Sequence, residues 1–188
     1  MNAVEHIVEC YFRYCKSCFT MTDVKIQFGN NRQVDLLAYN LVAKEQYHVE
    51  SSVTHCENWS PSTDDLREIF DKKFLGLPPD REGKNTDRAK GKTYFDKIKQ
   101  TYQGVGFNLS KIYRVFVTWV IPDKADLDRF LKNYGKNHGI RVRVLSFRDD
   151  ILPALLEKIS TSNYEDEVLR TLSLLRQYEF QAKREAKS

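Results

Sequence analysis

Two acidic residues lie near the middle of two neighbouring segments that alternate between polar and apolar side chains. The first segment, residues 32–39, contains Asp35, and the second, residues 46–54, contains Glu50. Both segments are rich in β-branched and aromatic residues, so each predicts a β-strand, and the short connection between them predicts a hairpin. An ionised carboxylate in a mostly apolar strand is costly unless it is compensated. Because a divalent cation would compensate both acids, the pair predicts a metal site.

The rest of the chain must supply the elements that position these two strands. Apolar residues at period two or in one buried run predict strands, and apolar residues three or four positions apart predict helices. Further strands are expected at residues 18–28, 112–121 and 140–145, and helices at residues 3–16, 60–74, about 94–102, 126–134, 151–159 and 163–183. Elements in this order predict an α/β fold, with a mixed central sheet that has helices on both faces.

The composition fits one domain of ordinary size. The chain has 188 residues but only 8 glycines and 5 prolines, so it can bury a full core and shows no dividing linker. We expect a single domain over 1–188, with its core in about 1–160 and a helical extension in about 161–188.

The net charge of +4 is compatible with an anionic partner. No apolar run is long enough to span a bilayer and no secretory signal is recognised, which predicts a cytoplasmic protein.

The cysteines offer a second kind of metal site. Cys15 and Cys18 form a CxxC pair, and His55 and Cys56 follow the third predicted strand, so these four residues are an alternative set of zinc ligands. A thioredoxin-like motif would open a helix, whereas this CxxC closes one. One CxxC without a matching second pair is a weak signal. Free thiols are the favoured interpretation, and structural zinc is not expected.

Three acidic residues fall on the first helix and on the second and third strands. They are Glu5, Asp35 and Glu50. With this element order, the sequence resembles the PD-(D/E)XK nuclease superfamily, which includes restriction endonucleases and Holliday-junction resolvases. The phrase Gln-Val-Asp-Leu-Leu-Ala at 33–38 is similar to the Asp motif of the superfamily, and His-Val-Glu-Ser-Ser at 48–52 takes the place of its Glu-x-Lys motif. The resemblance implies a restriction endonuclease-like αβββαβ core followed by C-terminal helices.

The resemblance also implies an activity, which is metal-dependent hydrolysis of phosphodiester bonds in nucleic acid, with DNA preferred. Magnesium or manganese is the expected cofactor, because hard cations take carboxylate and carbonyl oxygens. The expected metal ligands are Asp35, Glu50, the carbonyl of Ser51 and, through a water molecule, Glu5. Gln33 and His48 share the strand faces of the two acids and are expected to position water or to contact the nucleic acid.

One position departs from the superfamily's pattern. The catalytic lysine of the motif would fall at position 52, where this chain has Ser52. A serine can hydrogen-bond a water molecule but carries no positive charge for the scissile phosphate. Either another lysine reaches the same point, or Ser52 orients the water, or the fold binds nucleic acid without cutting it. Lys73 is the first candidate for a migrated lysine, because it continues the inward stripe of the helix that contains Leu66, and Lys97 is the second.

Simpler explanations exist for each acid. Asp35 would be unremarkable on an uncovered strand face, and Glu50 would be satisfied by pairing with Arg32 or His48 across the sheet. Glu5 stands three residues after Asn2, which is the spacing of a helix capping box. Under these explanations the chain has no metal site at the two strands.

A basic segment follows the predicted site. Residues 76–92 lack any period and are rich in turn residues, which predicts a long loop. Its Lys84, Arg88, Lys90 and Lys92 are candidates to neutralise backbone phosphates, although a solvated loop explains them equally well. The alternative to a nuclease is therefore an inactive nuclease-fold protein that binds nucleic acid or acts as a scaffold. The apolar stripe of the last helix further suggests a homodimer.

Overall fold

The structure is a computed structural model of the whole chain. It describes residues 2–26, 32–53, 60–77, 94–121, 123–160 and 162–186. Most of the basic segment expected as a loop, residues 78–92, lies outside these ranges, as do His55 and Cys56.

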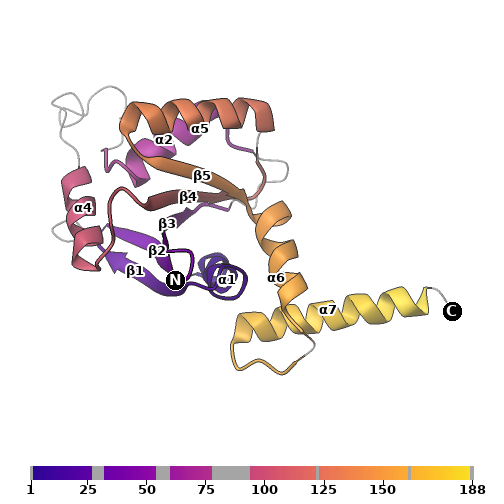
Figure 1. The fold of residues 1–188 in the computed structure, drawn as a ribbon. Coiled ribbons are helices and arrows are strands. Elements are labelled where there is room, and N and C mark those ends of the chain that lie inside the picture. Colours follow the sequence, from indigo (N-terminus) through magenta and orange to yellow (C-terminus); the bar gives the residue numbers. More distant parts are fainter. Residues whose placement is uncertain are drawn as a thin grey trace.

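Five strands form one mixed sheet in the order β1-β2-β3-β4-β5 (Figure 1). The strands are β1 (Phe19–Lys25), β2 (Gln33–Asn40), β3 (Glu45–Ser51), β4 (Ile112–Thr118) and β5 (Arg141–Ser146). The first three are antiparallel neighbours, as consecutive hairpins require, whereas β3, β4 and β5 run parallel because helices connect them. The mixed sheet expected from the sequence is confirmed, with each predicted strand in its place.

One face of the sheet is covered by the first helix and by a later one. α1 (Ala3–Cys10) continues into a π-helical segment, Tyr11–Cys15, and packs its buried side with α6 (Leu152–Lys158) against the sheet. The apolar core on this face includes Val8, Phe12, Leu36, Ala38, Tyr47, Val49, Val115, Val117 and Ile151. These strand residues alternate along β2, β3 and β4, so the residues between them point to the opposite face.

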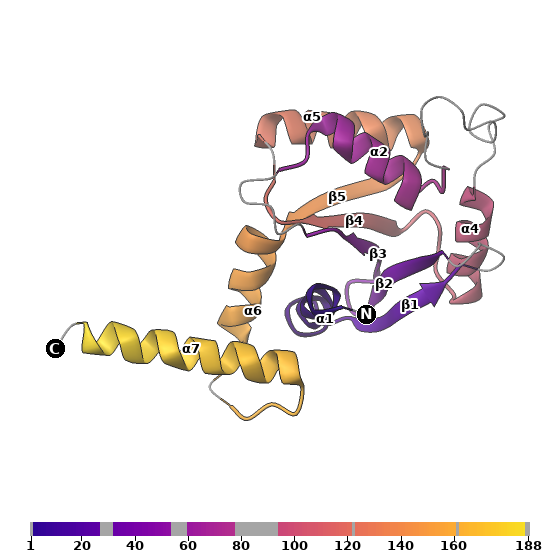
Figure 2. The ribbon, with the colours of Figure 1, turned by 180° about the vertical axis from the view of Figure 1, so that it is seen from behind.

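The opposite face carries three helices, which places helices on both sides of the sheet as expected (Figure 2). α2 (Thr63–Lys73) and α5 (Lys124–His138) pack around Phe70 and Phe116, and α4 (Phe95–Gly104) packs through Ile98 and Tyr102. α2 begins with a capping box in which Ser62 and Asp65 satisfy each other's backbone donors, as the Ser-Pro-Ser-Thr start predicts. The other end of α2 lies beside the middle of the sheet, where its last residue, Lys73, contacts Glu50 of β3.

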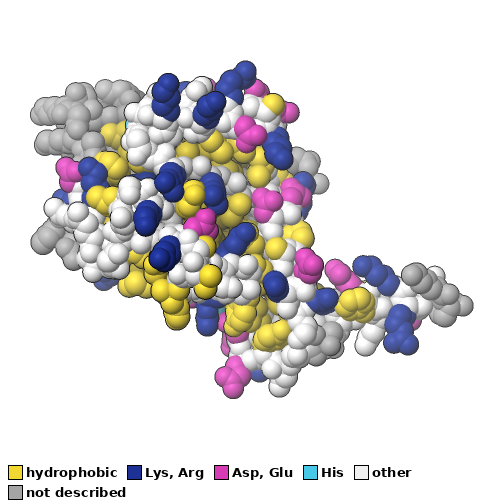
Figure 3. All heavy atoms as spheres, viewed as in Figure 1, with side chains coloured by type: hydrophobic (Ala, Val, Ile, Leu, Met, Phe, Trp, Pro, Cys, Tyr) yellow, Lys and Arg dark blue, Asp and Glu magenta, His cyan; other side chains and the backbone are white. Residues whose placement is uncertain are grey.

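The last helix extends away from this body. α7 (Glu167–Glu185) starts against α1 and α6 and then projects outwards (Figures 1 and 2). Its first half buries Leu169 and Leu172, whereas its projecting half exposes Leu174, Leu175, Tyr178 and Phe180. Lysine and arginine side chains lie beside hydrophobic ones on this projection (Figure 3). Among the helices that the structure describes, none has the length and apolar character needed to cross a membrane.

Candidate active site

The two predicted acids meet where the central strands separate. The backbone pairing of β2 with β3 is recorded as far as Leu36 opposite Val49, whereas β3 stays paired with β4 up to Ser51 opposite Val117. At this fork the carboxylate of Asp35 accepts a hydrogen bond from the backbone N–H of Ser51, at 2.8 Å. Beyond the last backbone pair, the side chain of Asp35 thus keeps β2 in contact with β3.

A lysine from another element lies between the two carboxylates. The Lys73 ammonium is 2.5 Å from Oε2 of Glu50 and 3.9 Å from Oδ1 of Asp35. Lys73 is the last residue of α2, so the helix that covers this face delivers the charge to the fork. Asp35, Glu50 and Lys73 are therefore gathered at one point, and within the part of the chain that the structure describes the two carboxylates share the Lys73 ammonium.

Glu50 is held by a chain of buried polar side chains. Its Oε1 accepts a hydrogen bond from Nε2 of His48 at 2.8 Å, and Nδ1 of His48 lies 2.5 Å from the hydroxyl of Tyr102. Arg114 of β4 lies over the ring of Tyr102, with 5.7 Å between its guanidinium carbon and the ring centre. His48, Glu50 and Tyr102 are at most 1% exposed and Arg114 is 2% exposed. Such outer partners fix the orientation of a carboxylate ligand.

The protonation states follow from these contacts. Burial alone would raise the pKa of Glu50, but the hydrogen bonds and charges of His48 and Lys73 outweigh it and hold that pKa below its usual range. Burial lowers the pKa of His48 more than Glu50 raises it. A neutral His48 therefore donates from Nε2 to an ionised Glu50 and accepts at Nδ1 from Tyr102.

Asp35 behaves in the opposite way. Burial, and next the nearby charge of Glu50, raise its pKa from 3.8 to about 6, although Lys73 and the Ser51 N–H partly oppose this. Burial would lower the pKa of Lys73, but Glu50 and Asp35 raise it overall. The fork thus combines one carboxylate that is firmly ionised with one whose charge is poorly compensated. Two carboxylates with separated pKa values can take different chemical roles.

An open pocket of about 330 Å³ adjoins the fork. Its lining contains both acids, Lys73 and three further polar side chains, Arg32, Gln33 and Lys72, together with Ile26 and Ile98. Arg32 stacks over the ring of Tyr94, with 4.7 Å between its guanidinium carbon and the ring centre. Sequence reasoning considered Arg32 only as a pairing partner of Glu50, and it did not place Lys72 at this site. The available signal was sequence position, because Arg32 precedes Gln33 and Lys72 precedes Lys73.

The remaining predicted site residues are spread around the fork. The Ser51 N–H points to Asp35, and since both backbone groups of a strand residue face the same edge, its carbonyl faces that edge too. Ser52 is exposed just past β3 and is not among the residues that line the pocket. Glu5 forms the capping box with Asn2, yet its charge still reaches Asp35 and Lys73. Lys97 lies on α4 beside the ring of Tyr94.

The expectation that His48 contacts the nucleic acid or a reacting water requires correction. Its side chain is completely buried between Phe74, Tyr102 and Glu50, so it acts on Glu50 and not on a ligand in the pocket. The alternation of β3 placed His48 on the same face as Glu50 but could not show that α2 and α4 cover that part of the face.

The basic residues predicted to contact nucleic acid, Lys84, Arg88, Lys90 and Lys92, lie outside the described residues.

Replacing His48 with phenylalanine tests this role. The change removes the donor to Glu50 and leaves a buried carboxylate and the Tyr102 hydroxyl short of a partner, which costs about 1–3 kcal/mol. We expect lower stability in urea and, if the fork binds magnesium as the sequence predicts, an affinity for that ion that falls roughly 10-fold to 100-fold. His48→Gln, which keeps an N–H donor, should recover part of both losses. Equal metal affinity in His48→Phe and the wild type would contradict the assignment.

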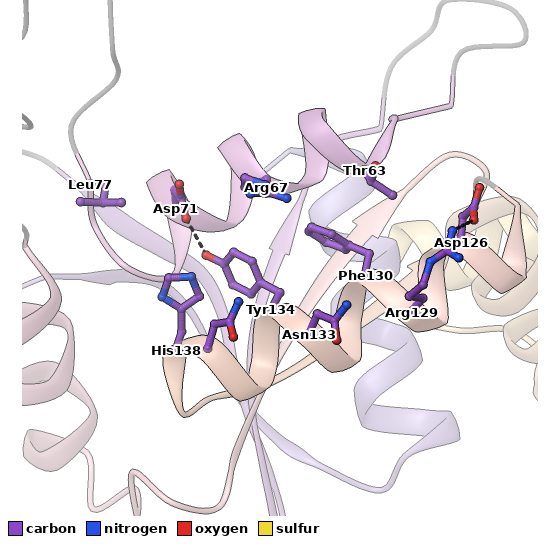
Figure 4. Close-up of a pocket in the computed structure, with 11 residues that line it drawn as sticks. Thr63, Arg67, Asp71, Leu77, Asp126, Arg129, Phe130, Asn133, Tyr134 and His138 are labelled. Atoms are coloured by element: carbon purple, nitrogen blue, oxygen red, sulfur yellow. Dashed lines mark hydrogen bonds and ion pairs between the residues drawn. The ribbon is translucent and has the colours of Figure 1, made fainter.

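A larger pocket of about 510 Å³ lies between α2 and α5 (Figure 4). There Tyr134 of α5 points to Asp71 of α2 and donates a hydrogen bond to it at 2.8 Å. Arg67, Arg129 and Asn133 line the same space. In this pocket Tyr134 engages Asp71 and Arg129 pairs with Asp126, whereas at the fork Lys73 lies between Asp35 and Glu50.

Comparison with known proteins leaves the family open. No protein-family model matches the sequence, and no curated protein matches it. A solved structure described as a protein of unknown function, AF1548, is similar in part, with a TM-score of 0.42 and 17% sequence identity. The match covers 83% of this chain and 66% of that chain.

Proposed function

We propose that the protein is a metal-dependent nuclease that hydrolyses phosphodiester bonds in nucleic acid, with DNA as the preferred substrate. The observation that supports this most is the position of Lys73. Its ammonium contacts Glu50 and faces Asp35, so α2 supplies the positive charge that Ser52 lacks. Two acids and a lysine at a fork between strands are the set that the resemblance to PD-(D/E)XK nucleases implies.

The donor set fits magnesium or manganese. Asp35 and Glu50 would hold the ion, with the Ser51 carbonyl as a further oxygen ligand. When bound, such an ion lowers the pKa of water and offsets charge that develops on a phosphate. His48 keeps Glu50 ionised and oriented, and Lys73 offers an ammonium to a phosphate oxygen. That the two carboxylates already share one cation supports the view that the fork accommodates positive charge.

The surroundings suit a polyanionic substrate. Arg32, Lys72 and Lys73 line the same pocket as the two acids. Cationic side chains around such a site contact phosphates without reading the bases, which favours binding that is independent of sequence and weakened by salt. Lys84, Arg88, Lys90 and Lys92 remain predicted members of this surface.

A second candidate is a nuclease-fold protein that binds nucleic acid or serves as a scaffold without cleavage. One observation favours this alternative. The Lys73 ammonium lies 2.5 Å from Glu50 and compensates its negative charge, so this carboxylate needs no metal ion for that purpose. Under this alternative, magnesium would change neither stability nor the integrity of bound DNA.

Glu50→Gln separates the two candidates. Purified protein is incubated with linear, branched and single-stranded DNA in magnesium or manganese, and its melting temperature is recorded with and without the metal. The wild type should cut DNA and should melt at a higher temperature with metal, because an ion that binds the folded state stabilises it. Glu50→Gln should lose both responses, whereas Asp128→Asn, a control at an exposed position on α5, should keep them.

Two outcomes would overturn the nuclease proposal. Cleavage that persists in Glu50→Gln would mean that the fork is not the active site. A wild type that cuts no substrate but retains DNA in a salt-dependent manner would favour the binding protein.

We also propose that the protein is cytoplasmic. Cys10, Cys15 and Cys18 are free thiols, which suits the reducing cytoplasm that the sequence predicts.

A homodimer through α7 also stays a prediction. Leu174, Leu175 and Tyr178 supply an exposed apolar stripe at helical spacing on the projecting half of that helix, where a second copy would bury it.

A further inference from the structure

A second cluster of metal-ligating side chains joins the first helix to the start of the last. Nε2 of His6 lies 2.9 Å from Oδ2 of Asp166, although 160 positions separate the two residues. Cys10 follows His6 by one helical turn on α1. Among the described residues, these three form a group whose ligand atoms all lie within 4.8 Å of one another. The cluster is separate from the fork carboxylates.

The backbone fixes the direction of each donor. Residues four apart on a helix share a face, which holds His6 and Cys10 on the same side of α1. Asp166 is the N-cap of α7, where its Oδ1 accepts hydrogen bonds from the N–H groups of Val168 and Leu169 at 3.0 Å each. That cap orients the carboxylate and leaves Oδ2 in contact with His6. The same arrangement, a ligand held by backbone donors, supports metal ligands elsewhere in proteins.

The surroundings combine a buried sulfur with an open side. Cys10 is 0% exposed and lies in an apolar cluster with Leu155, Ile159, Leu169 and Leu172. Burial, and next the negative charges of Asp166 and Glu9, raise the pKa of the Cys10 thiol, so the sulfur keeps its proton until a cation takes the place of that proton. The side chains of His6 and Asp166 are 28% and 23% exposed, so an ion has a path to the cluster and a water molecule has room beside it.

We infer that His6, Cys10 and Asp166 bind a single zinc ion. A thiolate, an imidazole and a carboxylate are ligands that zinc takes in tetrahedral sites, and three of them leave one position for water. Tetrahedral zinc would require donor separations of roughly 3.3–3.7 Å, so side-chain adjustments of about 1 Å suffice. The Cys10 thiol gives up its proton to solvent as its sulfur becomes a ligand, and the ion offsets the charge of Asp166.

Such an ion would act as a clamp. It would connect α1, which covers the sheet, to the N-terminus of α7, which projects from the body. The direction of the projecting helix would then depend on zinc.

Cobalt(II) provides the test, because it replaces zinc in tetrahedral sites and a thiolate ligand gives it a charge-transfer absorption band. The full-length protein, freed of metal with a chelator, is titrated with cobalt and then with zinc. We expect the thiolate band to rise to one equivalent of cobalt and zinc to abolish it. Cys10→Ser should lack the band, and His6→Asn, a change at a partly exposed position, should weaken cobalt binding at least about 10-fold.

Two control variants make the result specific. Cys15→Ser should keep the band, which would exclude a site built from Cys15 and Cys18. Glu50→Gln should also keep it, so failure of the nuclease proposal would leave this test intact. Retention of the band in Cys10→Ser, its loss in Cys15→Ser, or the absence of any thiolate band in the wild type would overturn the zinc site.

Discussion

Lys73→Met is expected to reduce magnesium-dependent cleavage by about 100-fold to 1,000-fold, the range found when one preorganised charge or donor is removed from an active site. The methionine keeps most of the apolar length of lysine but carries no ammonium for the phosphate. Metal binding should become tighter in the same variant, because the competing cation at 2.5 Å from Glu50 is gone. Single-turnover cleavage and the magnesium dependence of the melting temperature measure the two effects.

The opposite signs of these two effects distinguish a catalytic lysine from a structural one. If Lys73 only supported the fold, its replacement would weaken cleavage and metal binding together. Lys72→Met removes the neighbouring charge from the same pocket and should affect mainly the affinity for DNA. Unchanged cleavage in Lys73→Met would remove Lys73 from the mechanism and would return attention to Ser52.

Asp35→Asn is expected to abolish cleavage and at the same time to stabilise the metal-free protein at neutral pH. Burial raises the pKa of Asp35 from 3.8 to about 6, so the folded state holds its proton more tightly than the unfolded state. Stability therefore falls as the pH rises between these values and stays lower above about pH 6. Each pKa unit corresponds to about 1.4 kcal/mol, so a gain of about 1–3 kcal/mol is expected from asparagine.

Urea unfolding in a chelator, at about pH 4 and about pH 7, checks this prediction. The variant and the wild type should differ little at the lower pH and most at the higher one. Glu50→Gln is the matched control with the reverse sign, because His48 and Lys73 hold the pKa of Glu50 low and its charge therefore favours the fold. An Asp35→Asn variant less stable than the wild type at pH 7 would show that the Asp35 charge is well compensated.

Much of this arrangement could be predicted from local patterns. The alternation of β2 grouped Asp35 with Gln33, that of β3 grouped Glu50 with His48, and the apolar stripe of α2 put Lys73 on its inward side. Each of these groupings depends only on the period of one element, whereas the meeting of the three charged side chains depends on how the strands and α2 pack.

The outer partners of the site could not be predicted in this way. His48, Tyr102 and Arg114 come from β3, α4 and β4, and their contact depends on how α4 lies over the sheet. Arg114 offered one signal, since a charged residue in an otherwise apolar strand requires a buried partner. The pairing of His6 with Asp166 was equally hidden, because it depends on where the last helix returns to the first.

The placement of Lys73 on a helix, and not on the strand that bears Glu50, makes the site a composite of two separable structural units. Asp35 and Glu50 belong to β2 and β3, whereas the ammonium is in place only when α2 is docked on the sheet. If the fork cleaves DNA as proposed, a partial opening that lifts this helix would remove the ammonium and with it the activity. Catalytic competence would then be governed by the local stability of a single helix and could be lost well before global unfolding.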